Sequence, residues 1–288
     1  MSQFVHLHLH TQYSVLDGAI KIKDVIARAK EYGQEAVAIT DHGVMHGVVE
    51  FYECAKAEGL KPIIGCEVYI TGGSRFEKKA KSHGGASTYH LTLLAQNHTG
   101  YLNLCRLVTR GFTEGFYGKP RIDYELLKES SEGLICLSGC VSSEFSSYSK
   151  SHDLAGGRAH VERYLKLFGD RFYLEVQPHD FPEQKQLNRF AQDIGQSLGV
   201  PLVATNDAHY LCAGDTHAHE VLMCVSTGKL ITDPDRLKHE GAMLHLKNYD
   251  EMVAGLPGLE EAVKLSRSIA ERCELSFDFS TYYMPRFE

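Results

Sequence analysis

The chain has 288 residues, of which 43% are hydrophobic and 23% charged, and its formal net charge is −7. This length exceeds what one (β/α) barrel needs, and the composition is that of a soluble enzyme with a large buried core. No apolar run approaches the roughly 18 residues of a membrane span. The N-terminus opens directly into a strand-like segment, which argues against a signal peptide.

The eight cysteines are scattered along the chain without a CxxC pair. Such scatter favours reduced thiols, and we expect a cytoplasmic protein that does not associate with membranes. The net charge is negative and no basic run stands out beyond Lys78–Lys81, so the sequence does not show the basic face usual for a protein that binds nucleic acid by itself. If DNA is the substrate, another part of the assembly must hold most of it.

Seven strand-like segments follow one another, at 4–9, 35–40, 62–70, 89–95, 133–138, 171–177 and 200–205. Their residues are apolar or alternate between apolar and polar. Helical patterns separate most of these segments, at 22–29, 46–58, 97–110, 158–168 and 183–198, and several end at a glycine. Alternating strands and helices predict a mostly parallel sheet, and seven strands at this spacing predict a TIM-like (β/α) barrel.

The connection at 72–88 differs from the others because it is polar and glycine-rich, with no apolar stripe for a crossover helix. A parallel crossover needs about a dozen residues, which are usually helical. Strands 62–70 and 89–95 are therefore expected to run antiparallel. That arrangement returns His90, at the start of its strand, to the same rim as Glu67.

No linker marks a second domain, so residues 1–288 are expected to form a single domain. Its barrel core is expected to occupy about residues 1–250. An amphipathic helix is expected at 257–273, within a C-terminal helix and tail at 257–288.

Potential metal ligands lie at the ends of most strand-like segments. They are His8, His10, Asp17, His42, Glu67, His90, Cys140, Asp207 and His209. Ligands from separate strands can meet only where those strands surround a common centre, and barrel enzymes place their chemistry just beyond the C-terminal strand ends. The pattern therefore predicts a multinuclear metal site at that rim, suited to cleaving phosphate esters.

Context decides which of these residues count as ligands. A His-x-His pair alone is weak in a chain with 16 histidines. In FVHLHLHT, however, the imidazoles share one strand face and the apolar side chains the other, with His6 expected as a hydrogen-bonded barrel residue. Glu67 lies inside an apolar strand, where an uncompensated carboxylate costs several kcal/mol.

Neighbouring residues of the same types are expected to have simpler roles. Asp41 is interpreted as a helix N-cap and Cys136 as a core thiol. Cys140 lies beyond a glycine at the strand end, where a thiolate ligand fits better.

The segments HLHLHTQYSVLDG, ITDHG, GCEVYI, YHLTLLA, SGC and ATNDAHY resemble the motifs of the PHP (polymerase and histidinol phosphatase) domain. GFYGKPRIDYELL narrows the resemblance to the PHP domain of bacterial replicative DNA polymerase III alpha subunits of the DnaE type. The resemblance covers essentially the whole chain and implies a distorted seven-stranded (β/α) barrel with a trinuclear metal cluster. The chain ends about where the polymerase body would begin, so it is not expected to polymerise DNA.

The resemblance also implies how the ligands are shared among three ions. The expected groups are His8, His10, Glu67 and Asp207; Asp17, His42 and His209; and a bridging Glu67 with His90 and Cys140. Imidazole, carboxylate and a single thiolate fit Zn²⁺ or Mn²⁺, or else Fe²⁺, better than Mg²⁺.

Such a centre would hydrolyse phosphate esters with a metal-bound hydroxide. The favoured reaction is 3′→5′ exonucleolytic proofreading at a DNA 3′ terminus, with the remainder of the alpha subunit as a partner. Two alternatives remain: a small-molecule phosphatase of the histidinol-phosphatase type, and a non-catalytic, metal-stabilised scaffold that docks a separate proofreading exonuclease subunit. Lys119, Arg121 and His179 are expected phosphate contacts near the rim, although ordinary surface or loop roles fit them equally well.

Overall fold

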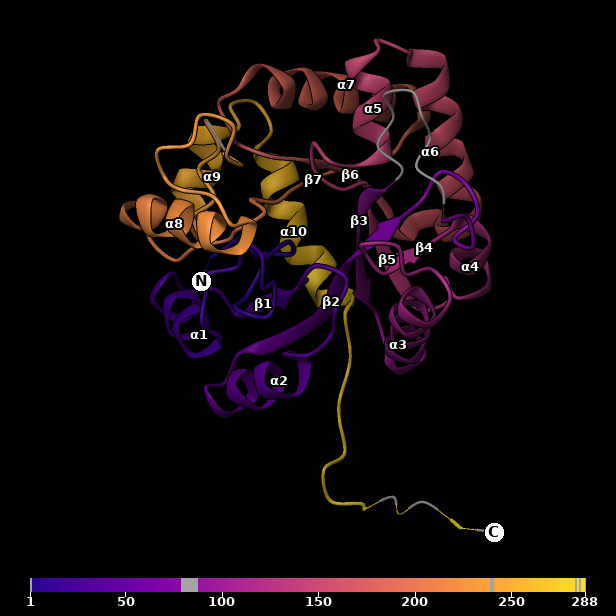
Figure 1. The fold of residues 1–288 in the computed structure, drawn as a ribbon, viewed down its shortest axis with the longest axis vertical. Helices are drawn as coiled ribbons and strands as arrows, with labels where there is room; N and C mark the ends of the chain where they lie inside the picture. Colours follow the sequence, from indigo (N-terminus) through magenta and orange to yellow (C-terminus); the bar gives the residue numbers. More distant parts are fainter. Residues whose placement is uncertain (1, 79–87, 239–240, 283, 285, 288) are drawn as a thin grey trace.

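The computed structural model describes residues 2–78, 88–238, 241–282, 284 and 286–287. A curved sheet with the order β1-β2-β3-β5-β6-β7 lies at its centre, and β4 pairs with β2 outside that path. The strands are β1 (Ala36–Ile39), β2 (Lys61–Ile70), β3 (Tyr89–Ala95), β4 (Arg121–Ile122), β5 (Leu134–Leu137), β6 (Phe172–Val176) and β7 (Leu202–Ala204). Helices surround this sheet, as Figure 1 shows. The architecture is a distorted α/β barrel.

The strand β3 runs against both of its neighbours. It pairs antiparallel with β2, where His90 lies opposite Tyr69, and antiparallel with β5. The other paired strands in the sheet run parallel. The antiparallel arrangement predicted from the polar connection is therefore confirmed, and it brings the start of β3 to the end of β2.

The N-terminal segment bridges the two ends of the sheet, but it is not the regular strand expected at 4–9. The backbone N–H groups of Ala38 and Thr40 donate to the carbonyls of His6 and Leu9 at 2.9 Å, and the N–H of His10 donates to Ala208 at 2.8 Å. The Leu9 N–H donates to the side-chain oxygen of Thr40 at 2.8 Å, which interrupts the backbone ladder. The segment is extended and closes the barrel without forming a continuous ladder.

The helices are α1 (Ile22–Glu31), α2 (Val48–Ala57), α3 (His98–Thr113), α4 (Tyr124–Glu129), α5 (Glu144–Lys150), α6 (Leu154–Phe168), α7 (Pro182–Leu198), α8 (Thr216–Thr227), α9 (Tyr249–Gly255) and α10 (Glu260–Arg272). The six helices expected from the sequence are present. The sequence did not predict α4, α5, α8, α9 or the two-residue β4. No helix among the described residues is long and apolar enough to cross a membrane.

The helix α10 packs against the end of the barrel where the parallel strands begin. Ile269 and Ala270 on α10 share a buried cluster with Leu7, Ala38 and Val203. This apolar packing fills the interior of the barrel at the end where the parallel strands begin. The polar side chains of the strand ends are left to gather at the opposite rim.

Candidate metal centre

All nine side chains predicted as ligands meet at the rim formed by the C-terminal ends of the parallel strands. In the first group, His8 Nε2 lies 3.2 Å from both Glu67 Oε1 and Asp207 Oδ1. His10 Nε2 lies 3.0 Å from the same Asp207 oxygen. These separations are short enough for one cation to reach all four side chains.

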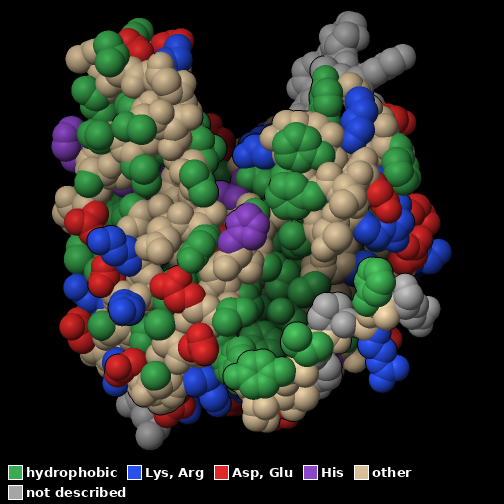
Figure 2. Space-filling view, turned by 60° about the horizontal axis from the view of Figure 1, so that its bottom comes forward, with side chains coloured by type: hydrophobic (Ala, Val, Ile, Leu, Met, Phe, Trp, Pro, Cys, Tyr) green, Lys and Arg blue, Asp and Glu red, His purple; other side chains and the backbone are tan. Residues whose placement is uncertain are grey.

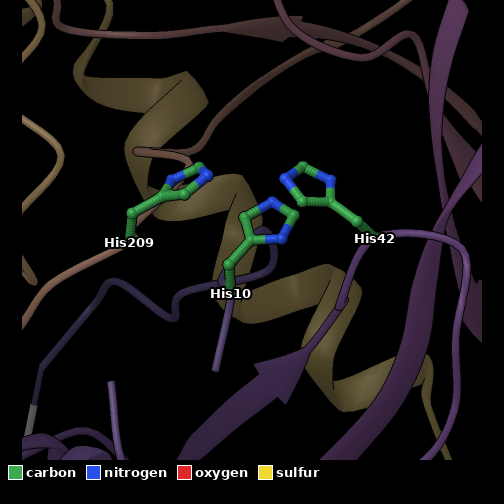
Figure 3. Close-up of side chains that lie close together, drawn as sticks. All are labelled: His10, His42 and His209. Carbon is green, nitrogen blue, oxygen red and sulfur yellow. The ribbon is translucent and has the colours of Figure 1, made fainter. Parts of the chain in front are cut away.

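The second group lies beside the first. His42 Nε2 is 3.2 Å from Asp17 Oδ1, and His209 Nε2 is 3.9 Å from Asp17 Oδ2. The ring centre of His10 lies 4.0 Å from that of His42 and 4.3 Å from that of His209. Figure 3 shows these three imidazoles converging from separate parts of the chain.

The third group extends from Glu67. His90 Nδ1 lies 3.0 Å from Glu67 Oε1, and Cys140 Sγ lies 3.8 Å from that oxygen and 3.9 Å from His90 Nδ1. Glu67 also contacts His8 and His42. It therefore occupies the bridging position among the three groups.

Backbone conformation places two of these side chains. Asp207 has a φ of +50°, in the left-handed region that aspartate and asparagine tolerate better than most residues. Gly139, with a φ of +83°, precedes Cys140, and a Cβ at Gly139 would lie 2.8 Å from the His90 carbonyl oxygen. Glycine thus lets the chain turn closely past β3 and bring the thiol to the rim.

Outer hydrogen bonds hold three of the imidazoles by Nδ1 and leave Nε2 facing the centre. His8 Nδ1 donates to Glu175 Oε1 at 2.7 Å, His10 Nδ1 lies 3.0 Å from Ser14 Oγ, and His209 Nδ1 donates to the Asp207 carbonyl at 2.7 Å. Partners of this kind fix the tautomer and ring orientation of metal-binding histidines.

Glu175, on β6, is the residue of this outer layer that sequence reasoning missed. It is fully buried, and its Oε1 also accepts hydrogen bonds from Thr205 Oγ1 at 2.5 Å and from Gln177 Nε2 at 2.9 Å. A signal was present: Glu175 stands inside the apolar run FYLEV, as Glu67 stands inside its own strand.

Asp41 does not cap a helix, so that interpretation was wrong. The N-cap of α2 is Gly47, which has no side chain with which to cap the helix. The Asp41 carboxylate instead accepts hydrogen bonds from Thr11 N at 2.6 Å and from Ser14 Oγ at 2.8 Å. Ser14 Oγ is also the partner of His10 Nδ1. Asp41 therefore helps to hold the His10 imidazole in place through Ser14.

The roles expected for His6 and Cys136 are confirmed. His6 Nε2 donates to the Lys247 carbonyl at 2.8 Å, and burial lowers the pKa of its imidazole to about 4. Cys136 is completely buried within the main hydrophobic core. Neither side chain belongs to the cluster of nine.

The electrostatics of the centre favour anionic carboxylates. Burial raises the pKa of the Glu67 carboxyl, but His90 and His42 outweigh it and hold that pKa well below its usual range. Burial, followed by His42 and His209, lowers the pKa of His10 to about 3, so its imidazole is neutral. Burial opposes the charged form of His8 and His42, but the neighbouring carboxylates outweigh it, raising the pKa of His8 well above its usual value and that of His42 to about 10. Metal binding requires neutral imidazoles, so a bound cation must displace protons from these two rings.

Cys140 carries its proton in this environment. Burial raises the pKa of its thiol well above the usual value, and the carboxylates of Asp207 and Glu67 add to that effect. A cation bound at Cys140 must displace this proton, so its affinity is expected to increase as the pH rises.

Four polar atoms of the cluster are buried and make no well-formed hydrogen bond among the described residues, although they lie 3.0–3.2 Å from other side chains of the cluster. They are His8 Nε2, His10 Nε2, Asp17 Oδ1 and Asp207 Oδ1. A coordinated cation would satisfy these donor atoms together. The nitrogen, oxygen and sulfur donors therefore fit divalent transition metals.

The three residues predicted to contact phosphate lie in different settings. Lys119 Nζ donates to the Tyr69 hydroxyl at 2.9 Å, and the Tyr69 ring lies beside His42 and His90. Arg121 is buried, and its guanidinium donates to the carbonyls of Gly115, Arg75 and Glu77. The expectation that Arg121 contacts phosphate is therefore wrong, because its side chain is buried and serves to hold these carbonyls.

His179 follows β6 and is buried, with its ring centre 6.2 Å from that of Phe181. It lines a cavity of about 520 Å³ with Lys185 and Arg189. Its contact with phosphate stays a prediction. Figure 2 shows a hollow between two lobes of the molecule, where basic, histidine and hydrophobic side chains gather.

Cys136, on β5, and Cys140, just beyond its end, provide a direct test of the third group. Cys140→Ser is expected to weaken one metal site with little loss of stability, because a hydroxyl replaces the thiol. Cys136→Ser should keep all its metal but lower the free energy of unfolding by roughly 1–3 kcal/mol, since it buries a polar group in the apolar core. Metal content and melting temperature measured on both variants decide the assignment. The opposite pattern would show that the wrong cysteine was chosen.

The barrel gathers imidazoles, carboxylates and a thiol at one rim, as a metal-binding α/β domain does. The PHP domain model matches residues 6–179, and the chain belongs to the PHP domain family.

Two relatives are named DNA polymerase III subunit alpha. That of Thermus aquaticus is 43% identical over 293 residues, covering 99% of this chain and 24% of the relative. That of Deinococcus radiodurans is 43% identical over 296 residues, covering 99% of this chain and 22% of the relative. The chain thus spans about a quarter of the length of these curated relatives.

A solved structure described as a candidate metal-dependent phosphoesterase from Bifidobacterium adolescentis aligns with a TM-score of 0.43 and 12% identity. The alignment covers 87% of this chain and 96% of that protein.

Proposed function

We propose that the nine clustered side chains bind three divalent cations and that the chain hydrolyses DNA phosphodiester bonds from a 3′ end. The observation that carries the proposal is the convergence of buried ligand atoms that make no well-formed hydrogen bond, on His8, His10, Asp17 and Asp207. The similarity to alpha subunits of a DNA polymerase favours DNA as the substrate and proofreading as the role.

The charges of the site support a phosphate substrate. Asp17, Glu67, Asp207 and a Cys140 thiolate contribute four negative charges, fewer than the six positive charges of three divalent cations. Divalent cations held by these residues would supply Lewis-acid activation of water and would offset the charge that develops during displacement at phosphorus. The remaining positive charge attracts an anionic phosphodiester.

The chain's own residues supply orientation. Glu67 bridges the groups, and the Nδ1 partners of His8, His10 and His209 hold those rings with Nε2 toward the centre. Hydrolysis forms a bond from a water oxygen to phosphorus and breaks the bond to the O3′ of the preceding nucleotide. That O3′ leaves with a proton, and a 5′-nucleotide is released.

The activity test uses a 5′-labelled single-stranded oligonucleotide and histidinol phosphate as alternative substrates for the same zinc- or manganese-loaded protein. We expect a ladder of progressively shorter oligonucleotides and little phosphate released from histidinol phosphate. The reverse preference would support a small-molecule phosphatase. Full metal content without hydrolysis of either substrate would support a scaffold role.

Metal stoichiometry provides a separate prediction. Protein purified without chelator is expected to carry about three transition-metal ions per chain, because nine ligands with one bridging carboxylate suit three sites. Elemental analysis of protein of known concentration measures this number. One ion or none would contradict the trinuclear centre.

A further inference from the structure

Four aromatic side chains near β4 are exposed to solvent. Phe76 is 58% exposed, Phe112 41%, Phe116 50% and Tyr117 44%. Phe112 lies in the last turn of α3, Phe116 and Tyr117 precede β4, and Phe76 follows β2. We call these four residues the aromatic face. Exposed aromatic side chains gathered in this way mark binding surfaces in soluble proteins.

The backbone beneath the aromatic face is held by buried and charged groups. Arg121 Nε donates to Gly115 O at 3.0 Å, and Lys78 Nζ donates to Phe116 O at 2.7 Å. The Arg121 guanidinium lies 5.3 Å from the centre of the Tyr117 ring. The Phe112 and Phe116 rings are nearly parallel, with centres 6.1 Å apart. The surface is therefore ordered before any ligand binds, which reduces the entropy cost of binding.

A chain of contacts joins the aromatic face to the metal centre. Tyr117 and Lys119 form an isolated antiparallel bridge across Gly118. Lys119 Nζ lies 4.5 Å from the centre of the Tyr69 ring and donates to its hydroxyl. Tyr69 follows Glu67 by two residues on β2, and its ring centre is 5.2 Å from that of His90. A DNA strand whose 3′ end lies in the metal centre would therefore pass Lys119 first and Tyr117 next.

From this arrangement we propose that the aromatic face binds single-stranded DNA leading into the metal centre. Bases stack on Phe116 and Tyr117, and Lys119 contacts the backbone phosphate between them and the centre. Aromatic platforms beside cations bind single strands in a sequence-tolerant way, because every base presents a π-face. A duplex keeps its base faces covered. The inference rests on the proposed function, which places the 3′ end at the metal centre.

Binding is tested with the 288-residue chain and a 5′-fluorescein-labelled dT12 strand, using fluorescence anisotropy in an Asp207→Asn background that prevents cleavage. Tyr117→Ala and Phe116→Ala are each expected to weaken binding at least about fivefold, the lower end of what one stacked base contributes. Tyr117→Trp should restore it. Lys119→Met should weaken binding and reduce the slope of log affinity against log salt by about one.

The matched control is Phe279→Ala, which removes a ring with 51% exposure from the C-terminal segment and should leave binding unchanged. Melting temperature and metal content are measured for every variant. Unchanged dT12 affinity in Tyr117→Ala and Phe116→Ala overturns the inference and points to a protein partner for this face. A loss of affinity that follows a loss of stability also overturns it. If the variants weaken dT12 binding but the parent chain hydrolyses no DNA, the inference stands and the proposed nuclease activity fails.

Discussion

Asp207→Asn is expected to lower the rate of DNA cleavage by more than about 100-fold, because loss of an outer hydrogen-bond partner alone costs 10–100-fold and Asp207 is placed to contact the metal directly. Its Oδ1 lies 3.2 Å from His8 Nε2 and 3.0 Å from His10 Nε2. An amide in its place removes the negative charge. The measurement is the initial rate of shortening of a 5′-labelled single strand.

Asparagine is the right substitute because Asp207 has a φ of +50°, which asparagine also adopts readily. The fold should therefore survive, and the far-UV circular dichroism should match that of the parent protein. Asp193→Asn, at an exposed position on α7, is the control and should keep full activity. Undiminished cleavage by Asp207→Asn would remove that residue from the proposed centre.

Glu175→Gln is expected to reduce metal affinity about 10–100-fold, the usual effect of losing an outer-layer partner of a metal-binding histidine. The substitution preserves shape but removes the carboxylate charge that holds His8 by Nδ1. Competition with a chromophoric chelator measures the affinity. Glu53→Gln, at an exposed position on α2, is the control.

Glu175→Gln should also destabilise the metal-free protein. The Glu175 carboxylate pairs with His8 Nδ1 at 2.7 Å in a buried setting, and removing one partner of a buried pair lowers the free energy of unfolding. Weaker metal binding, measured under conditions in which the variant is fully folded, would show that Glu175 positions His8. Reduced stability with unchanged metal affinity would show a purely structural role.

Sequence patterns predicted the barrel because its strands are apolar runs bounded by turn residues and helices. They also predicted the reversal of β3, since a polar connection cannot pack as a crossover helix. They failed at residues 4–9, where Leu9 N–H is taken by a side-chain oxygen of Thr40 instead of a backbone carbonyl. The pattern of apolar and polar residues cannot indicate that a side-chain oxygen replaces a backbone carbonyl as hydrogen-bond acceptor.

Most of the nine clustered residues were predictable because they are polar side chains in or just beyond an apolar strand; Asp17, which stands in the turn before α1, was the exception. Glu175 gave the same signal in FYLEV, but nothing in its own segment indicated His8 as its partner, 167 residues away. Arg121 shows the opposite problem. Its basic side chain suggested a phosphate contact, whereas the folded segments at Arg75 and Gly115 surround its guanidinium with carbonyl groups. Long-range contacts of this kind come only from the tertiary structure.

The reversal of β3 also bears on how the chain between β2 and β3 can change over evolution. Since β2 ends and β3 begins at the same rim, both ends of their connection are fixed beside Glu67 and His90. A parallel crossover would have to return to the far end of the barrel, so its length would be tied to the height of the sheet. An antiparallel connection carries no such requirement, and in general doubling the length of a loop adds only about 0.6 kcal/mol of closure entropy. Insertions and deletions between the two strands can therefore accumulate while the nine side chains stay in place.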